Sequence, residues 1–283
     1  QVVGTVDGGN WVRMLGSGST AVSVSSIDTV IGGAQTDTVV MLSTGQISVS
    51  NVETVQGTTD TTDAVRLFGA GTVVVSAVES VIGTTATGEV AQLLAAGSLS
   101  VSAVETVIGS TGTDSVIVLS GGNVAVSTIE SVVGTAGTET VTMLDAGNVS
   151  VSAIETVVGS TGTGDSVTFL GATSIGVSNI ETAIGSGDSG EDILRLLGTA
   201  GAAVSVSNID TVLGAAGAGT ETVTLMGAAN VAVSSVDTVT GSTGTDSVTM
   251  LGAGSLTVST IETVTGSTST TTNDVLRILG EGN

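Results

Sequence analysis

The chain has 283 residues and a formal net charge of −22, from 26 acidic residues against four arginines, with no lysine and no histidine. So acidic a chain repels nucleic acid and anionic lipid and attracts cations, and we expect no nucleic-acid partner. The absence of cysteine excludes a disulfide framework and a thiolate metal site. No run of about 18 apolar residues is present, so we expect no membrane insertion.

Residue composition favours strands along the whole chain. Valine, threonine, serine, glycine and alanine dominate, proline is absent, and the aromatic residues are Trp11, Phe68 and Phe169. β-Branched residues favour strands, and no window of about eleven residues shows helical periodicity. We therefore predict an all-β protein with essentially no helix.

One sequence unit recurs along nearly the whole chain. Residues 104–128, VETVIGSTGTDSVIVLSGGNVAVST, return in variant form at 129–153 and at 236–260. Copies begin at Ile27, Val52, Val78, Val104, Ile129, Ile154, Ile180, Ile209, Val236 and Ile261. Their spacing of 25 to 29 residues indicates a repeat architecture in which each unit stacks on its neighbours.

Each copy contains three short strand patterns. In residues 236–260 they lie at 236–239, 247–251 and 256–259, joined by two Gly-rich turns, and the last bends at Thr260 into the next copy. Alternation puts Val248 and Met250 on one face and Thr249 on the other. The residues predicted to face inward are Val236, Val239, Val248, Met250, Leu256 and Val258, with Leu251 near a corner. Other copies supply aliphatics at these places, Ala183 being among the smallest.

These features predict a right-handed parallel β-solenoid, similar to a β-helix or β-roll. We expect about 11 rungs of 25–29 residues with three short strands per rung, paired in register at about 4.8 Å. Extra residues fall in one kind of turn, at 185–192, 214–221 and 266–274, where such a fold tolerates insertion.

We interpret residues 1–283 as a single β-solenoid repeat domain. Residues 1–4 align with 29–32, and residues 280–283 align with 252–255, so the chain begins and ends inside a repeat. Repeat domains normally carry polar terminal caps, and unpaired rung edges favour association. We therefore expect a segment of a longer chain, or end-to-end or lateral self-association.

A serine precedes the bend in every copy. A small hydroxyl there can bond to backbone groups or to the next serine of the column, whereas catalysis would need a base that histidine or lysine would supply. We therefore assign a structural role to Ser25, Ser50, Ser76, Ser102, Ser127, Ser152, Ser178, Ser207, Ser234 and Ser259.

Two further positions hold acids in every copy. The first comprises Asp28, Glu53, Glu79, Glu105, Glu130, Glu155, Glu181, Asp210, Asp237 and Glu262, and the second Asp37, Asp63, Glu89, Asp114, Glu139, Asp165, Asp192, Glu221, Asp246 and Asp274. We call them the first and second acid columns. If successive copies stack at about 4.8 Å, neighbouring carboxylates repel by roughly 1 kcal/mol per pair in water. Hydrogen bonds from threonine and backbone N–H groups, solvation, or bound cations would offset that repulsion.

The turn before the second acid column resembles a known family. Residues 109–117, GSTGTDSVI, and 241–249, GSTGTDSVT, resemble the nonapeptide G-G-x-G-x-D-x-U-x of RTX (hemolysin-type) repeats, over about nine residues per copy. That resemblance implies Ca²⁺ held between stacked turns by Asp carboxylates and turn carbonyls. The residues it implicates are Asp114 and Asp246 foremost, then Asp37 and Asp165, then Glu139 and Asp63, with Gly109, Gly112, Gly241 and Gly244 shaping the turns. No organic cofactor is expected.

The remaining patterns carry weaker alternatives. The four arginines, Arg13, Arg66, Arg195 and Arg277, share one outward position, and we interpret them as solvated side chains near acids. A docking face for an acidic partner is the alternative. The outward position is too mixed for an ice-matching array of threonines. No copy departs enough from the repeat to build a polysaccharide-cleaving cleft, so we expect no enzyme.

Two non-enzymatic functions remain. One is a structural or spacer solenoid, with or without calcium, from a large RTX-like bacterial surface or secreted protein of the adhesin type. The other is a self-assembling subunit of an extracellular filament, sheath or surface layer. Both place the protein outside the cell or at the cell surface.

Overall fold

The structure is a computed structural model that describes residues 1–5, 7–198, 201–215, 219–270 and 272–280. Within these ranges every regular element is a β-strand, which confirms the all-β prediction. The same ranges contain no helix that is long and apolar enough to cross a membrane. Part of the expected insertions (residues 216–218 and 271) and the chain end (281–283) lie outside the described residues.

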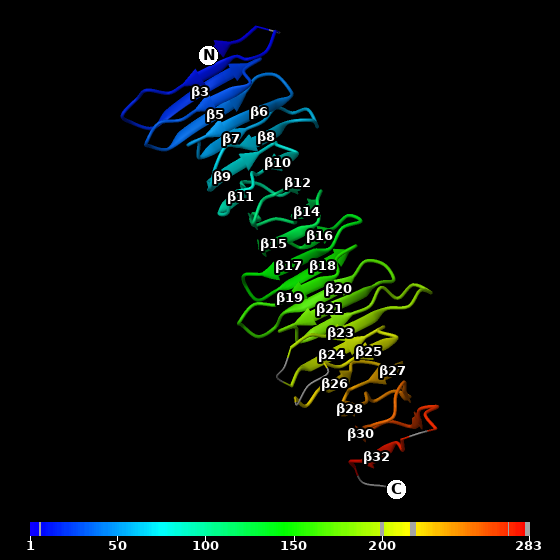
Figure 1. The fold of residues 1–283 in the computed structure, drawn as a ribbon. Helices are drawn as coiled ribbons and strands as arrows, with labels where there is room; N and C mark the ends of the chain where they lie inside the picture. Colours follow the sequence, from blue (N-terminus) through cyan, green and yellow to red (C-terminus); the bar gives the residue numbers. More distant parts are fainter. Residues whose placement is uncertain (6, 199–200, 216–218, 271, 281–283) are drawn as a thin grey trace. The chain divides into compact units, whose positions relative to one another are not determined.

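Odd-numbered strands form one sheet, sheet A, and even-numbered strands form a second, sheet B (Figure 1). Sheet A comprises β1 (Val2–Val3), β3 (Thr20–Ser25), β5 (Asp37–Met41), β7 (Thr54–Gln56), β9 (Gly71–Ser76), β11 (Glu89–Leu93), β13 (Thr106–Ile108), β15 (Gly122–Ser127), β17 (Glu139–Met143), β19 (Thr156–Val158), β21 (Ser174–Ser178), β23 (Ile193–Leu196), β25 (Thr211–Leu213), β27 (Asn230–Ser234), β29 (Ser247–Met250) and β31 (Thr263–Thr265). Sheet B comprises β2 (Trp11–Arg13), β4 (Thr29–Ile31), β6 (Gln46–Ser50), β8 (Ala64–Leu67), β10 (Ser80–Ile82), β12 (Ser98–Ser102), β14 (Ser115–Val118), β16 (Ser131–Val133), β18 (Asn148–Ser152), β20 (Ser166–Phe169), β22 (Thr182–Ile184), β24 (Ala203–Ser207), β26 (Thr222–Leu225), β28 (Thr238–Thr240), β30 (Ser255–Ser259) and β32 (Val275–Ile278).

The chain is a parallel β-solenoid with two strands per turn and about 15 turns. Val81 of β10, for example, pairs in parallel with Val65 of β8 and with Val101 of β12, so one turn takes 16 to 20 residues. The prediction of about 11 rungs with three strands each is therefore wrong.

The error comes from equating one sequence copy with one turn. Each copy makes three connections, and each connection crosses to the opposite sheet: residues 104–128 supply β13, β14 and β15 in sheets A, B and A. The next copy then supplies β16, β17 and β18 in sheets B, A and B. Because three crossings are an odd number, two copies complete three turns and successive copies start on opposite sheets.

The chain divides into two compact units, Gln1–Val141 and Thr142–Asn283. Both units are built from the same two-strand turn. The interpretation of residues 1–283 as one domain stays a prediction, and each site below is described within a single unit.

Alternating aliphatic residues fill the space between the two sheets. Val65 and Val248 are fully buried, and all six residues predicted to face inward in 236–260 are buried, as is Ala183. Leu251, placed near a corner in the prediction, is 52% exposed. The alternation of each strand was thus sufficient to assign the core, although the strands belong to a different number of turns.

Each copy turns one corner at a non-glycine residue in the left-handed region. The corner residue directly follows the serine column, and φ lies between 49° and 55° at Ser26, Asn51, Ala77, Ala103, Thr128, Ala153, Asn179, Asn208, Ser235 and Thr260. This conformation costs an ordinary residue about 1–2 kcal/mol, and asparagine tolerates it better. The strain is compatible with the fold because the corner is held by the ladders on both sides.

A glycine of the adjacent turn lies against these corners. A Cβ atom added to Gly109 would lie 2.0 Å from the carbonyl oxygen of Thr128, and one added to Gly57 would lie 1.7 Å from that of Ala77. Since real Cβ atoms do not approach a carbonyl oxygen so closely, only glycine fits where corner and turn meet.

We expect Thr128→Asn to stabilise the protein by about 0.5–1 kcal/mol, because asparagine pays less than a β-branched residue for the left-handed corner. Asparagine already occupies the equivalent position at Asn51, Asn179 and Asn208. Urea denaturation of variant and parent measures the difference. Thr140→Asn, at an outward strand position, is the control and is expected to be slightly destabilising. A loss of stability in Thr128→Asn would contradict the strain argument.

Candidate functional site

Nine of the ten acids of the second column are buried, and Asp274 is half-buried. Asp37, Asp63, Glu89, Asp114, Glu139, Asp165, Asp192, Glu221 and Asp246 are each no more than 3% exposed. They do not stack at one-turn spacing, because successive copies lie on opposite sheets: Asp37 begins β5 of sheet A, whereas Asp63 precedes β8 of sheet B. Equivalent acids on one side are three turns apart, roughly 14 Å. The expected ladder of carboxylates at 4.8 Å is therefore wrong.

The neighbour of each second-column acid is instead a first-column acid, one turn further on. The N–H of Asp114 donates to Glu130 Oε2 at 2.7 Å, and the N–H of Asp246 donates to Glu262 Oε2 at 2.7 Å. Asp63 and Asp165 bond in the same way to Glu79 and Glu181. The two columns thus form one network in which carboxylates cap backbone N–H groups.

The Asp114 carboxylate shows the complete pattern. Its Oδ1 accepts the N–H of Gly97, one turn back, at 2.9 Å, and its Oδ2 accepts the N–H and, at 2.9 Å, the Oγ–H of Ser110 in its own turn. Asp63, Asp165, Asp192 and Asp246 repeat this arrangement with Thr58, Ser160, Ser186 and Ser242 as the hydroxyl donors. These hydrogen bonds join the carboxylate to two successive turns.

Glutamate at this position keeps only part of the pattern. Thr84 donates its N–H and hydroxyl to Glu89 Oε1, but Glu89 Oε2 is buried with no partner among the described residues. The N–H of Gly71, one turn back, bonds to the Gly88 carbonyl oxygen rather than to the carboxylate. The extra methylene moves the carboxylate away from the preceding turn.

Among the described residues, Glu221 lacks the hydroxyl donor. Ala215 stands where the other copies place serine, threonine or, near Asp37, Gly33, and no described residue donates a hydrogen bond to the Glu221 carboxylate.

Burial raises the pKa of Glu89, but its hydrogen bonds, led by that of Thr84, hold the pKa below the ordinary value. Burial, and then the hydrogen bond and charge of Asp237, raise the pKa of Glu221. The pKa values of Glu89 and Glu221 shift in opposite directions because Glu89 has the Thr84 hydroxyl as a donor and Glu221 has Ala215 at that position.

We expect Glu221→Gln to stabilise the folded protein at pH 7 by on the order of 1 kcal/mol. A raised pKa means that the folded state binds the proton more tightly, so protonation of Glu221 contributes stability below the ordinary value of 4.5 and that contribution is lost as the pH rises through the folded pKa. The advantage of the variant should therefore shrink toward pH 4 in thermal melts. Glu89→Gln is the matched control and should destabilise at pH 7, since the pKa of Glu89 is lowered. Equal effects of the two variants would contradict this assignment.

The glycines implicated by the RTX resemblance serve packing. Gly109 and Gly241 lie against the corners at Thr128 and Thr260. Cβ atoms added to Gly112 and Gly244 would lie 2.4 Å and 2.7 Å from the Cβ atoms of Ala96 and Ala228, so the turn packs closely on the loop one turn back. Within the described ranges no three acidic side chains come together as a metal-binding group. Calcium binding at Asp114, Asp246 and their equivalents stays a prediction.

The serine and arginine positions have simple surroundings. Ser102 Oγ lies 3.2 Å from Ser120 Oγ, and Ser120 is not a member of the serine column, so this pair differs from the expected one. The four arginines are exposed but do not share one face, because Arg195 lies in sheet A and the other three in sheet B. Arg195 Nε–H donates to Ser174 Oγ at 3.1 Å.

Sequence reasoning missed the serine or threonine that follows the turn glycine and donates to the acid. Its signal was available, since Ser110, Ser160 and Ser242 recur four or five residues before their aspartates. Comparison of the chain with protein-family models, with curated proteins and with solved structures finds no match. The site is therefore interpreted from its own geometry.

Proposed function

We propose that the chain is a non-enzymatic, right-handed β-solenoid that serves as a stiff spacer in an extracellular or surface protein of a bacterium. The observation that supports this is the repetition of one turn design, with the same aliphatic core and, in most copies, an aspartate that accepts backbone N–H groups. A stack of this kind derives its stability from contacts between neighbouring turns and can extend without new design elements. The buried carboxylates accept hydrogen bonds from backbone N–H groups of successive turns and so hold these turns together.

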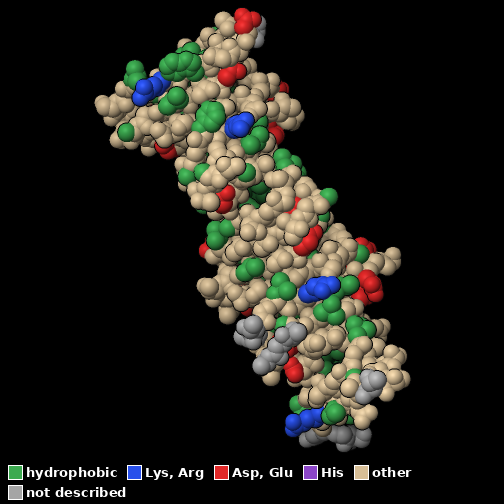
Figure 2. Space-filling view, in the orientation of Figure 1, with side chains coloured by type: hydrophobic (Ala, Val, Ile, Leu, Met, Phe, Trp, Pro, Cys, Tyr) green, Lys and Arg blue, Asp and Glu red, His purple; other side chains and the backbone are tan. Residues whose placement is uncertain are grey.

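A second candidate, a self-assembling subunit of a filament, sheath or surface layer, is favoured by a specific surface feature. A large apolar side chain follows the second strand of each copy and is 41–82% exposed, at Leu15, Leu42, Phe68, Leu94, Leu119, Leu144, Leu170, Leu197, Met226, Leu251 and Leu279. Figure 2 shows apolar side chains mostly as separate green spots among uncharged tan atoms. Isolated exposed apolar residues are common on monomers, so we rank this candidate below the spacer.

Sedimentation velocity over a range of concentrations separates the two candidates. A spacer should remain a monomer of 27.1 kDa with the frictional ratio of an extended particle. Concentration-dependent assembly that is abolished by replacing Leu94 and Leu144 with serine would favour the subunit. A compact monomer would contradict both.

Calcium is the separable part of the proposal, implied by the RTX resemblance. A cation bound only by the folded state raises the melting midpoint by mass action. Melts in millimolar CaCl₂ and in chelator, for the parent and for Asp246→Asn, measure this contribution. A midpoint that does not respond to calcium in the parent would remove calcium from the proposal and leave the hydrogen bonds as the support of the acids.

A further inference from the structure

Glu221, an acid of the second column, also lines a surface cavity. The cavity has a volume of about 350 Å³, and both Glu221 and Asp237 line it. Three further cavities, of about 260–400 Å³, lie at equivalent corners, next to Asp28, Glu53 and Glu181 of the first acid column. None of those three is lined by an acid of the second column. The copy with Ala215 in place of a hydroxyl residue has therefore an opening onto its buried acid.

Electrostatics in this cavity favour a cation. Glu221 is only 3% exposed, and its carboxylate receives no hydrogen bond from any described residue. Asp237 also lines the cavity, and its Oδ2 accepts the N–H of Glu221 at 2.9 Å. The charge and hydrogen bond of Asp237 contribute to the raised pKa of Glu221. A positive charge with N–H donors would supply what serine or threonine supplies in the other copies.

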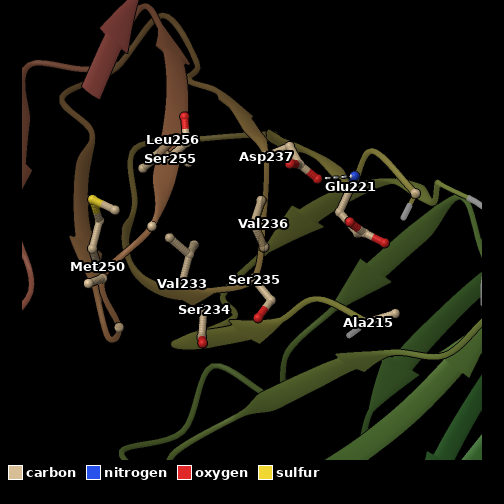
Figure 3. Close-up of a pocket in the computed structure, with 14 residues that line it drawn as sticks. Ala215, Glu221, Val233, Ser234, Ser235, Val236, Asp237, Met250, Ser255 and Leu256 are labelled. Carbon is tan, nitrogen blue, oxygen red and sulfur yellow. Dashed lines mark hydrogen bonds between the residues drawn. The ribbon is translucent and has the colours of Figure 1, made fainter. Parts of the chain in front are cut away.

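The opposite end of the cavity carries apolar side chains beside Ser255. Figure 3 shows the two carboxylates at one end, with Glu221 on the side of Ala215, and Met250 and Leu256 at the other end, beyond Val236. A bare metal ion would make no use of the apolar side chains at this end. Ca²⁺ takes six to eight oxygen ligands, whereas the cavity offers two carboxylates. A cationic head on a short aliphatic stem matches both ends.

We propose that this cavity binds a primary alkylammonium group, with its NH₃⁺ between Glu221 and Asp237 and its stem along Val236, Met250 and Leu256. The chain has no lysine, so the group comes from another molecule. It is either a free amine or the side chain of a lysine on a partner, and both present the same chemistry. The inference concerns ligand binding and does not depend on whether the solenoid is a spacer or an assembling subunit.

Isothermal titration of the intact chain with n-butylammonium chloride, at pH 7 and constant ionic strength, tests the proposal. We expect saturable binding with one site per chain, and binding weaker by about tenfold or more in Glu221→Gln, because a charge-assisted hydrogen bond is lost. Ala215→Ser should weaken binding as well, because its hydroxyl occupies the carboxylate. Glu89→Gln is the matched control and should bind like the parent, since Glu89 already has Thr84 as donor. Unchanged binding in both Glu221→Gln and Ala215→Ser would overturn the proposal.

Two further titrants make the test specific. Tetramethylammonium carries the charge without N–H donors, and n-butanol carries the stem without the charge. A response to either that equals the response to n-butylammonium would overturn the proposal, as would CaCl₂ that displaces the amine through a site of its own on Glu221. Nα-acetyl-lysine methylamide distinguishes the sources. Binding of this compound supports a lysine of a partner, and binding of n-butylammonium alone supports a free amine.

Discussion

Gly109→Ala is expected to destabilise the protein by about 3 kcal/mol or more. The added Cβ would lie 2.0 Å from the carbonyl oxygen of Thr128 and 2.9 Å from Asp114 Oδ2. Neither neighbour can move cheaply, because the first is backbone in a strained corner and the second is a carboxylate that accepts hydrogen bonds from two turns. Relief would require the two turns to separate, which breaks ladder hydrogen bonds on both sides of the corner.

Gly147→Ala is the control for this prediction. A Cβ at Gly147 would meet nothing within 4 Å, and its φ is not positive. Alanine there should be neutral or slightly stabilising, since it reduces the freedom of the unfolded chain. Urea melts of both variants within one two-state framework give the comparison. If Gly109→Ala were as stable as Gly147→Ala, the close contact between glycine and corner would not exist in solution.

How far the sequence alone predicts this structure depends on the feature. Alternation identified the buried faces, because each strand shows its own period of two: Val248 and Met250 are buried and Thr249 lies on the other face. The number of strands per turn could not be obtained in the same way. The sequence period counts copies, and nothing in the pattern around Thr260 distinguishes a gentle bend from a reversal to the opposite sheet. That distinction depends on a φ of 54°.

The acids illustrate a similar limit. The recurrence of an acid at the positions of Asp114 and Glu130 was visible in every copy, and so was the need for something to offset repulsion between carboxylates. The groups that offset the carboxylate charge are those that lie one turn away. The wrong turn count placed each second-column acid next to another second-column acid. With the correct count, Gly97 and Glu130 become the neighbours, and backbone N–H groups become the donors. Glu221 was marked in the sequence by Ala215, a departure that becomes meaningful only once the role of the serine is known.

Asp114→Ala is expected to cost about 3 kcal/mol or more in chelator, where no divalent cation contributes. The substitution leaves the N–H groups of Gly97 and Ser110, and the Ser110 hydroxyl, without their acceptor in a partly buried place. Each such group costs about 1–3 kcal/mol. The stability of Asp114→Asn should lie between those of Asp114→Ala and the parent. Its amide oxygen can accept hydrogen bonds from one turn, while its NH₂ group faces the donors of the other turn.

Asp60→Ala removes the same charge from an exposed position and is expected to change stability by less than about 0.5 kcal/mol. It therefore controls for the general effect of lowering a net charge of −22, which by itself is stabilising. Chemical denaturation in chelator and again in CaCl₂ completes the experiment. A large cost in both media assigns Asp114 to the hydrogen-bonded cap, whereas a cost that appears only with calcium would contradict this assignment and make cation binding its principal role.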